Sequence, residues 1–223
     1  MREGLVTATL VSVYDRVAAR YDLQHGLLTA HSDQRGRRLV VAKAVREADT
    51  ILDCGAGTGS SALLAARRAG ARGRVTLFDL SRAMLHVARE RAEAASGTAP
   101  MTFGVGDLLH LPFADGTFDV ALSTYSLCPV SDPVRGALEM FRVVKPGGRI
   151  GIAHSAEPRG ALRRWLADKV ESLVWRFPSI SLGCRSVAVL PALKQAGARL
   201  RFEAHIGIPL WPFAVFVLEK PAA

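Results

Sequence analysis

The chain has 223 residues, of which 49% are hydrophobic and 22% are charged, and its formal net charge is +9. This composition excludes a disordered chain, and the length predicts one domain with one sizeable core. The positive charge attracts nucleic acids, anionic membranes and acidic ligands alike, and solvated arginine-rich helix faces explain it equally well. The three cysteines lack a metal-type spacing, which predicts a reducing compartment and no metal site.

The apolar stretches of the chain are short. The longest uncharged stretch, residues 206–218, has 13 residues with two prolines, which is too short to cross a bilayer. The apolar run over residues 5–13 has no clear cleavage site, so we interpret it as part of the fold rather than as a signal peptide. We therefore expect a cytoplasmic protein, and peripheral contact with a membrane stays open.

The first elements expected in chain order are two helices over residues 6–20 and 34–48 and an apolar strand that begins at Thr50. Residues 51–59 then read Ile-Leu-Asp-Cys-Gly-Ala-Gly-Thr-Gly, and a helical run follows over residues 60–69. A strand, a glycine-rich turn and a helix in this order bring a nucleotide-like cofactor against bare backbone. The alternative is a glycine-rich turn of any α/β protein.

Acidic residues stand at the ends of three successive strands. Asp53 ends the first strand, Asp79 ends a strand over residues 75–78, and Asp107 follows a strand over residues 101–105. Doubly wound folds bind their ligands at the carboxyl ends of the strands. Three acids in these positions predict a ligand site rather than three unrelated solvated turns.

The second half of the chain continues the alternation of strands and helices. We expect strands over residues 118–123, 149–153, 199–205 and 213–219 and helices over residues 133–144, 160–177 and 187–196. Asp132 is the expected N-cap of the first of these helices. Because a short connection between the last two strands requires an antiparallel pair, one strand is reversed. The prediction is an α/β fold with a doubly wound, mostly parallel seven-stranded sheet and a reversed last strand.

The glycine turn resembles motif I of the class I S-adenosylmethionine (SAM) methyltransferases through Asp53, Gly55, Gly57 and Gly59. The resemblance implies a Rossmann-like fold and SAM as cofactor, with S-adenosylhomocysteine as product. It implies that Asp53 faces the ammonium of SAM, that Asp79 accepts from the ribose hydroxyls, and that Asp107 accepts from the adenine amino group. The residues expected to bind the cofactor are Tyr21, Asp53, Gly55, Ala56, Gly57, Asp79, Leu80, Met84, Gly106, Asp107, Leu108 and Thr124.

A narrower resemblance, to the ubiquinone/menaquinone biosynthesis C-methyltransferases, spans residues 14–158. It rests on Tyr-Asp-Arg-Val-Ala-Ala-Arg-Tyr-Asp at 14–22, Leu-Pro-Phe-Ala-Asp-Gly-Thr-Phe-Asp at 111–119, and Arg-Val-Val-Lys-Pro-Gly-Gly-Arg at 142–149. This resemblance implies a small, lipophilic, quinone-type acceptor.

The chain departs from the quinone enzymes at Gln24, His25 and His154 and over residues 125–129. The Leu-Cys-Pro-Val run that begins at Leu127 instead resembles phospholipid N-methyltransferases and related thiol methyltransferases. A quinol or phenol, a lipid headgroup amine and a thiol therefore stay open as acceptors. A catalytically silent SAM-binding module is the alternative from another class of protein.

The candidate catalytic side chains are Tyr21, Tyr125 and His154. Methyl transfer from a sulfonium needs orientation and a dry site rather than a protein nucleophile, so we interpret Cys184 and Arg185 as structural. A phenol or quinol acceptor benefits from a general base, and His154, with an ordinary pKa near ~6.5, is the best-placed residue. The alternatives are a rim histidine, a lining role for Tyr125 and core packing for Tyr21.

We expect a single methyltransferase domain over residues 1–223. Residues 1–48 are interpreted as a helical lid, residues 49–157 as the SAM-binding core, and residues 158–223 as the acceptor side with the final strand pair. The amphipathic helix over residues 160–177 covers a lipophilic pocket, rests on a membrane surface or covers the core. We expect a small lipophilic substrate and no nucleic acid as partner, and the pattern leaves the oligomeric state open.

Overall fold

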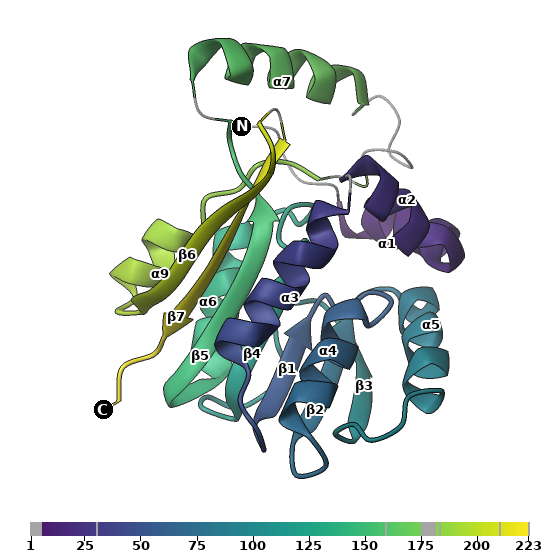
Figure 1. Ribbon diagram of the computed structural model, residues 1–223, viewed down its shortest axis with the longest axis vertical. Coiled ribbons are helices and arrows are strands. Elements are labelled where there is room, and N and C mark those ends of the chain that lie inside the picture. The colour runs from purple at the N-terminus through teal and green to yellow at the C-terminus, as the bar shows by residue number, and fades with distance from the viewer. Residues whose placement is uncertain are drawn as a thin grey trace.

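The computed structural model describes residues 6–29, 31–158, 160–174, 182, 184–209 and 211–222. A seven-stranded sheet with the strand order β3-β2-β1-β4-β5-β7-β6 forms its centre (Figure 1). The strands are β1 (Thr50–Cys54), β2 (Arg74–Asp79), β3 (Met101–Val105), β4 (Phe118–Thr124), β5 (Val144–Ser155), β6 (Arg199–Ile208) and β7 (Trp211–Glu219). Strands β1 to β5 pair in parallel, and β7 runs antiparallel to both β5 and β6. This arrangement confirms the predicted fold class.

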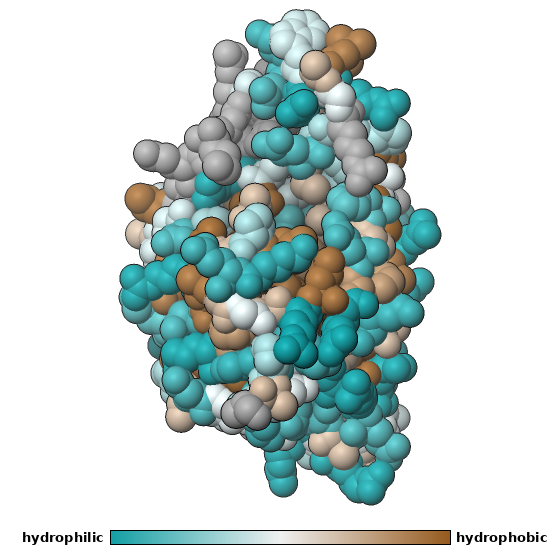
Figure 2. Space-filling model, turned by 90° about the vertical axis from the view of Figure 1, so that its left-hand side faces the viewer, coloured by the Kyte–Doolittle hydropathy of each residue, from teal (hydrophilic) through white to brown (hydrophobic). Residues whose placement is uncertain are grey.

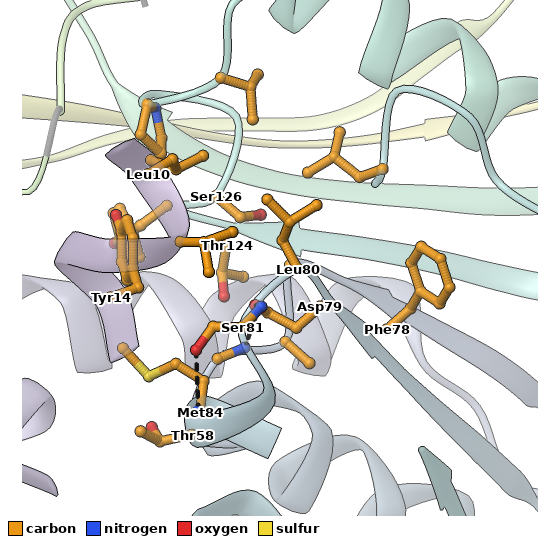
Figure 3. A pocket seen from close by; sticks show the side chains of 18 of the residues that line it. Leu10, Tyr14, Thr58, Phe78, Asp79, Leu80, Ser81, Met84, Thr124 and Ser126 are labelled. Atoms are coloured by element: carbon orange, nitrogen blue, oxygen red, sulfur yellow. Dashed lines mark hydrogen bonds between the residues drawn. The ribbon is translucent and has the colours of Figure 1, made fainter. Parts of the chain in front are cut away.

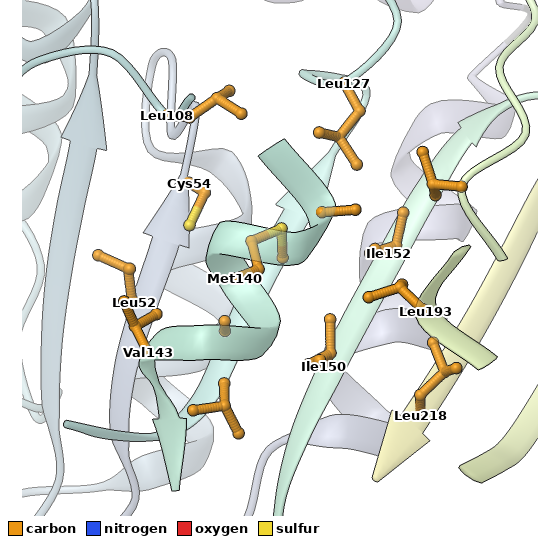
Figure 4. Close-up of a cluster of buried hydrophobic side chains, with 14 of the residues drawn as sticks. Leu52, Cys54, Leu108, Leu127, Met140, Val143, Ile150, Ile152, Leu193 and Leu218 are labelled. Carbon is orange, nitrogen blue, oxygen red and sulfur yellow. The ribbon is translucent and has the colours of Figure 1, made fainter. Parts of the chain in front are cut away.

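Helices cover both faces of the sheet. The helices α3 (Ser32–Ala44), α4 (Ser60–Ala69) and α5 (Arg82–Glu93) pack on one face, and α6 (Pro133–Val143) and α9 (Leu190–Gln195) pack on the other. Figure 4 shows Met140 and Val143 of α6 against Leu52 of β1 and Ile150 of β5. All four side chains are fully buried, so truncating one to alanine is expected to cost roughly 2–5 kcal/mol.

The N-terminal helices lie across the carboxyl ends of the strands (Figure 1). They are α1 (Thr7–Val17), the 3₁₀ turn η1 (Ala18–Arg20) and α2 (Tyr21–Leu28). Val13, Val17 and Tyr21 form a small apolar cluster with Met84 of α5. This cluster is separate from the two large clusters on the faces of the sheet, so the N-terminal helices form a cover of their own.

The N-cap residues predicted from the sequence mark the starts of two helices correctly. The side chain of Ser81 accepts a hydrogen bond from the N–H of Met84 and caps α5, and that of Asp132 accepts from the N–H of Arg135 and caps α6. The fifth strand begins at Val144 rather than at residue 149, because Val144 already pairs with Phe118.

Three other elements differ from the prediction. The helix α2 was not predicted, and α9 is shorter than the expected helix over residues 187–196. Strands β6 and β7 extend into the expected connection, where Ile208 pairs with Trp211. None of the helices in the described ranges has the length and apolar character needed to cross a bilayer.

Helix α7 (Ala161–Val174) stands apart from the sheet at the end of the molecule (Figure 1). Among its residues with described side chains, only Ala167 is not exposed. The described side chains of α7 therefore do not cover the core, and residues 175–177 of the predicted helix lie outside the described residues.

Candidate functional site

A cleft lies at the carboxyl ends of β1 to β4, beneath α1 (Figure 3). Its volume is about 70 Å³, well below the roughly 300–1,000 Å³ of pockets that hold small molecules, because α1 and Tyr21 of α2 close over it. The N-terminal helices must therefore move before a cofactor enters. The cleft is lined by Leu10, Val11, Tyr14, Tyr21, Arg37, Gly55, Ala56, Gly57, Thr58, Phe78, Asp79, Leu80, Ser81, Met84, Gly106, Asp107, Leu108, Thr124, Tyr125, Ser126, Pro129 and Val130.

The glycine turn forms the floor of the cleft. Gly55 and Gly57 have φ angles of 68° and 54°, a region that favours glycine. A Cβ atom at Gly55 would lie 2.3 Å from the Cβ of Ser126, which leaves no room for a side chain. A Cβ at Gly57 would meet no atom within 4 Å, so this part of the turn is open to a ligand.

Asp79 joins the end of β2 to the glycine turn. Its carboxylate accepts hydrogen bonds of 2.8 Å from the N–H groups of Gly57 and Ser81. Burial raises the pKa of Asp79, and these two N–H groups oppose the shift. The carboxylate is therefore held in place at the cleft, where its remaining lone pairs suit the hydroxyls of a ribose.

Asp53 lies behind the turn and does not line the cleft. Its side chain is buried, and neither carboxylate oxygen has a hydrogen-bond partner among the described residues. Burial raises the pKa of Asp53 to about 7, and Asp79 adds to the shift, while Arg37 and the nearby amide of Ala62 oppose it. A buried carboxyl without a partner is costly, so this position favours a cationic ligand group close to the turn.

Arg37 of α3 brings a buried positive charge to the cleft. Its Nη1 donates to Thr124 Oγ1 at 2.7 Å and to Ser61 Oγ at 3.3 Å. Neither Nε nor Nη2 makes a hydrogen bond with a described residue, and Nε lies 3.7 Å from Asp33. Nε thus forms an ion pair with Asp33, and the remaining donor Nη2 suits an anionic ligand group such as a carboxylate.

Tyr21 and Tyr125 both line the cleft. Tyr125 follows β4 with a φ of 64°, which is uncommon for a residue other than glycine and is typical of functional sites. Its hydroxyl donates to the carbonyl of Asp33 at 3.4 Å, and a Cβ at Gly36 would lie 2.1 Å from that oxygen. Burial raises the pKa of both tyrosines, so they stay protonated and act as hydrogen-bond donors rather than as bases.

His154 does not lie with the two tyrosines. It is buried in β5 outside the cleft lining, its Nδ1 lies 2.9 Å from the carbonyl of Ser155, and its ring packs against Phe216. Side chains alternate across a strand, so His154 shares the face of Ile152 rather than that of Ala153. Burial lowers the pKa of His154. The expectation that His154 faces the acceptor is therefore corrected.

The far end of the cleft suits a flat ring. Gly106, Asp107 and Leu108 line it after β3, and Met84 faces them from α5. Asp107 accepts from the N–H of Leu109 at 2.9 Å, which fixes the direction of its carboxylate. The remaining predicted residues in the lining are Ala56, Leu80 and Thr124.

Two aspartates tie the N-terminal helices to the cleft. Asp15 of α1 accepts a hydrogen bond from Ser81 Oγ. Asp22 of α2 accepts from the hydroxyls of Thr58 and Ser60 at 2.9–3.1 Å and forms an ion pair with Arg91. These aspartates belong to the two Tyr-Asp pairs of the sequence, so the repeated pair fixes the cover over the glycine turn.

Residues 3–163 match the model of the ubiE/COQ5 methyltransferase family. The chain belongs to this family. Its membership confirms the class of protein expected from the sequence, the SAM-dependent methyltransferases, and with it SAM as cofactor.

Curated members of the family match over part of their length. The ubiquinone/menaquinone biosynthesis C-methyltransferase UbiE of Haemophilus ducreyi is 32% identical over 150 residues, which cover 67% of this chain and 58% of that protein. UbiE of Desulfotalea psychrophila is 43% identical over 138 residues, covering 61% and 54%. The demethylmenaquinone methyltransferase of Symbiobacterium thermophilum is 33% identical over 147 residues, covering 66% and 59%. The chain thus spans less than two thirds of the length of these relatives.

Solved structures share the fold at low identity. The [4+2]-cyclase SpnF has a TM-score of 0.68 at 21% identity, over 94% of this chain and 97% of that one. A methyltransferase-like protein of Bacillus halodurans has a TM-score of 0.66 at 18% identity, over 83% and 98%. Because one of these folds carries a cyclase, the fold alone does not identify the reaction.

The charged residues of the cleft fit the cofactor of the ubiE/COQ5 family. The methionine end of SAM carries an ammonium and a carboxylate, and the cleft region offers the carboxyl of Asp53, which has no hydrogen-bond partner among the described residues, and the Nη2 donor of Arg37. Sequence reasoning missed Arg37. The helical spacing of Gly36, Val40 and Val41 puts Arg37 on the buried side of α3, and this spacing was the available signal.

Proposed function

We propose that the protein transfers a methyl group from SAM to a small lipophilic acceptor of the quinol or phenol type. The observation that carries the proposal is the buried, unpartnered carboxyl of Asp53 behind the open glycine turn, with Arg37 at the same cleft. This pair of opposite charges suits a zwitterionic methionine end better than it suits a phosphate. Membership of the ubiE/COQ5 family supports the same reaction.

Four residues at or behind the cleft have a proposed role toward the cofactor. Asp53 faces the ammonium, Arg37 and the open turn at Gly57 hold the carboxylate, and Asp79 accepts from the ribose hydroxyls. When bound, SAM supplies a methyl group on a sulfonium, a leaving group that is already activated. The remaining task of the chain is to orient the acceptor and to exclude water.

The lining near α1 favours an apolar acceptor. Leu10 and Val11 line it from α1, and Pro129 and Val130 line it from the loop after β4. The hydroxyls of Tyr21 and Tyr125 are the nearby donors, and they suit an acceptor that carries an oxygen. In the transfer, the nucleophilic atom of the acceptor forms a bond to the methyl carbon, the C–S bond breaks and its electron pair stays on sulfur, and the acceptor loses one proton.

No histidine is among the described residues that line the cleft. With both tyrosines held protonated, deprotonation of the acceptor falls to its own acidity in solution. We expect the pH dependence of kcat to follow the pKa of the acceptor. The lipid headgroup amine and the thiol are the competing acceptors.

Two measurements test the proposal. Transfer of tritium from labelled SAM is measured against quinols, phenols, phospholipids and thiols, and we expect label in the quinol or phenol. Calorimetry of the Asp79→Ala variant is expected to show SAM binding weakened by roughly 1.5–3 kcal/mol, because a buried acceptor of ligand hydroxyls is lost. Unchanged SAM affinity in this variant would refute the cofactor assignment, whereas label only in an amine or a thiol would refute the acceptor.

A further inference from the structure

Helix α7 turns its polar side toward its own protein. A cavity of about 630 Å³ separates the helix from the body, and Arg164, Asp168 and Ser172 of α7 line it. Ser155 and Arg185 line it from the body. Trp165, Ala167 and Lys169 complete the α7 side of this lining, whereas Leu162, Leu166 and Val170 are not part of it.

The apolar residues of α7 form one continuous stripe. Leu162, Trp165, Leu166 and Val170 are 70%, 57%, 40% and 41% exposed, and at about 100° per residue they span roughly 140° of the helix circumference. Lys169 stands within the stripe, with Nζ 5.8 Å from the centre of the Trp165 ring. The described part of the chain does not cover this apolar stripe, and an exposed stripe of this kind favours a binding partner.

Other exposed apolar residues lie at the same end of the molecule. Leu23 and Leu27 of α2 are 66% and 67% exposed, and Ile208, 50% exposed, stands where β6 turns into β7. Figure 1 shows α2, α7 and the β6–β7 turn at the end where the parallel strands have their carboxyl ends. Figure 2 shows hydrophobic atoms exposed among hydrophilic ones at that end. These exposed apolar residues and the cleft therefore lie at the same end of the molecule.

The charges of α7 favour an anionic lipid surface as the cover. The basic residue Arg163 borders the apolar stripe away from the cavity, and Lys169 stands at the edge of the stripe that meets the cavity, which Asp168 also lines. Apolar residues with a tryptophan on one side and basic residues beside them are typical of helices that lie in the plane of a membrane. The net charge of +9 attracts the same surface from a distance.

We propose that α7 lies in the interface of an anionic bilayer and holds the cleft side of the protein against it. Leu162, Trp165, Leu166 and Val170 enter the apolar boundary, and Arg163 and Lys169 meet the lipid phosphates. The docking itself is independent of methyl transfer. Its benefit, the delivery of a lipophilic acceptor from the bilayer, rests on the proposed function.

Sedimentation of the protein with lipid vesicles tests the docking. The probes are vesicles of phosphatidylcholine alone and of phosphatidylcholine mixed with phosphatidylglycerol. We expect binding to the mixed vesicles that is at least about tenfold tighter and that weakens with added salt. The double variant Leu162→Ser/Leu166→Ser is expected to lose at least about tenfold in binding to the mixed vesicles. Its matched control is Leu138→Ser, an exposed leucine of α6, which is expected to bind as the wild type does.

A double variant that removes two positive charges, with its control, and a measurement of the oligomeric state complete the test. Arg163→Gln/Lys169→Gln is expected to weaken binding to the mixed vesicles, and Lys194→Gln on α9 is the control. SAM affinity by calorimetry is expected to stay unchanged in all variants, which separates this proposal from the cofactor assignment. Three results would overturn the docking: no sedimentation of the wild type with the mixed vesicles, unchanged binding of Leu162→Ser/Leu166→Ser, or a dimer in light scattering that this variant dissociates.

Discussion

The carboxyl of Asp53 makes SAM binding depend on pH. Its pKa of about 7 means that the side chain is neutral in a large fraction of molecules below neutrality. Only the carboxylate form of Asp53 attracts the ammonium of SAM. Below pH 7 the free energy of deprotonating Asp53 is therefore subtracted from the free energy of binding. We expect the dissociation constant to rise about tenfold for each pH unit below 7, and by roughly 25-fold between pH 7.5 and pH 5.5.

The same group makes Asp53→Asn stabilising. The pKa rises from 3.8 to about 7 on folding, and such a difference corresponds to roughly 4 kcal/mol. Below pH 3.8 the carboxyl is protonated in both the folded and the unfolded state, so it does not lower the stability. The loss of stability grows as the pH rises from 3.8 to 7 and reaches its full size above pH 7. At pH 8 we expect Asp53→Asn to raise the free energy of unfolding by about 1–4 kcal/mol, because the neutral amide avoids the burial of a charge.

Calorimetry across a pH series and thermal unfolding at pH 8 measure the two effects. Asp53→Asn is expected to weaken SAM binding at pH 8 and to remove most of the pH dependence, while its Tm rises. Asp79→Asn is the matched control, because that carboxyl already has two N–H partners and its replacement offers no such gain in stability. A wild-type dissociation constant that stays flat from pH 7.5 to pH 5.5 would refute the assignment of Asp53 to the ammonium.

Two further predictions concern the acceptor side. His154→Gln is expected to keep kcat within about threefold of the wild type on a phenol or quinol, because the residue lies outside the cleft; a loss of the roughly 10²–10⁴-fold typical of a missing general base would contradict this placement. Gly36→Ala is expected to lower the free energy of unfolding by about 1–3 kcal/mol in thermal or urea unfolding, because its Cβ collides with the Tyr125 hydroxyl. Tyr125→Phe, which removes that oxygen, is expected to restore part of the loss in the double variant, and the absence of any rescue would show that the contact is not the cause.

The parts of the fold that depend on local chemistry were predictable. The glycine turn needs positive φ angles, and the caps at Ser81 and Asp132 need short polar side chains, so each leaves a mark in a few adjacent residues. The cleft residues after β2 and β3 follow from the rule that parallel strands end at one edge. This is why most of the expected cofactor residues line one cleft.

The features that depend on tertiary context were missed. An arginine in a charged helical segment is usually solvated, so composition does not single out Arg37, and only its position on the buried stripe of α3 marks it. His154 was placed at a strand end, but β5 continues to Ser155, and one residue of strand decides which face a side chain takes. For α7 the pattern predicts an apolar stripe but not which surface covers it.

The hydrogen bonds of Asp15 and Asp22 have a kinetic consequence. Because α1 and α2 close over the cleft, we expect cofactor and product to pass only while both contacts are broken. The fraction of molecules in which both contacts are broken scales the apparent affinity for either compound. A tighter fit between a ligand and the walls of the cleft therefore lengthens the residence time of the ligand but does not raise its rate of association. We expect that rate to depend on how often Asp15 and Asp22 release their hydroxyl partners.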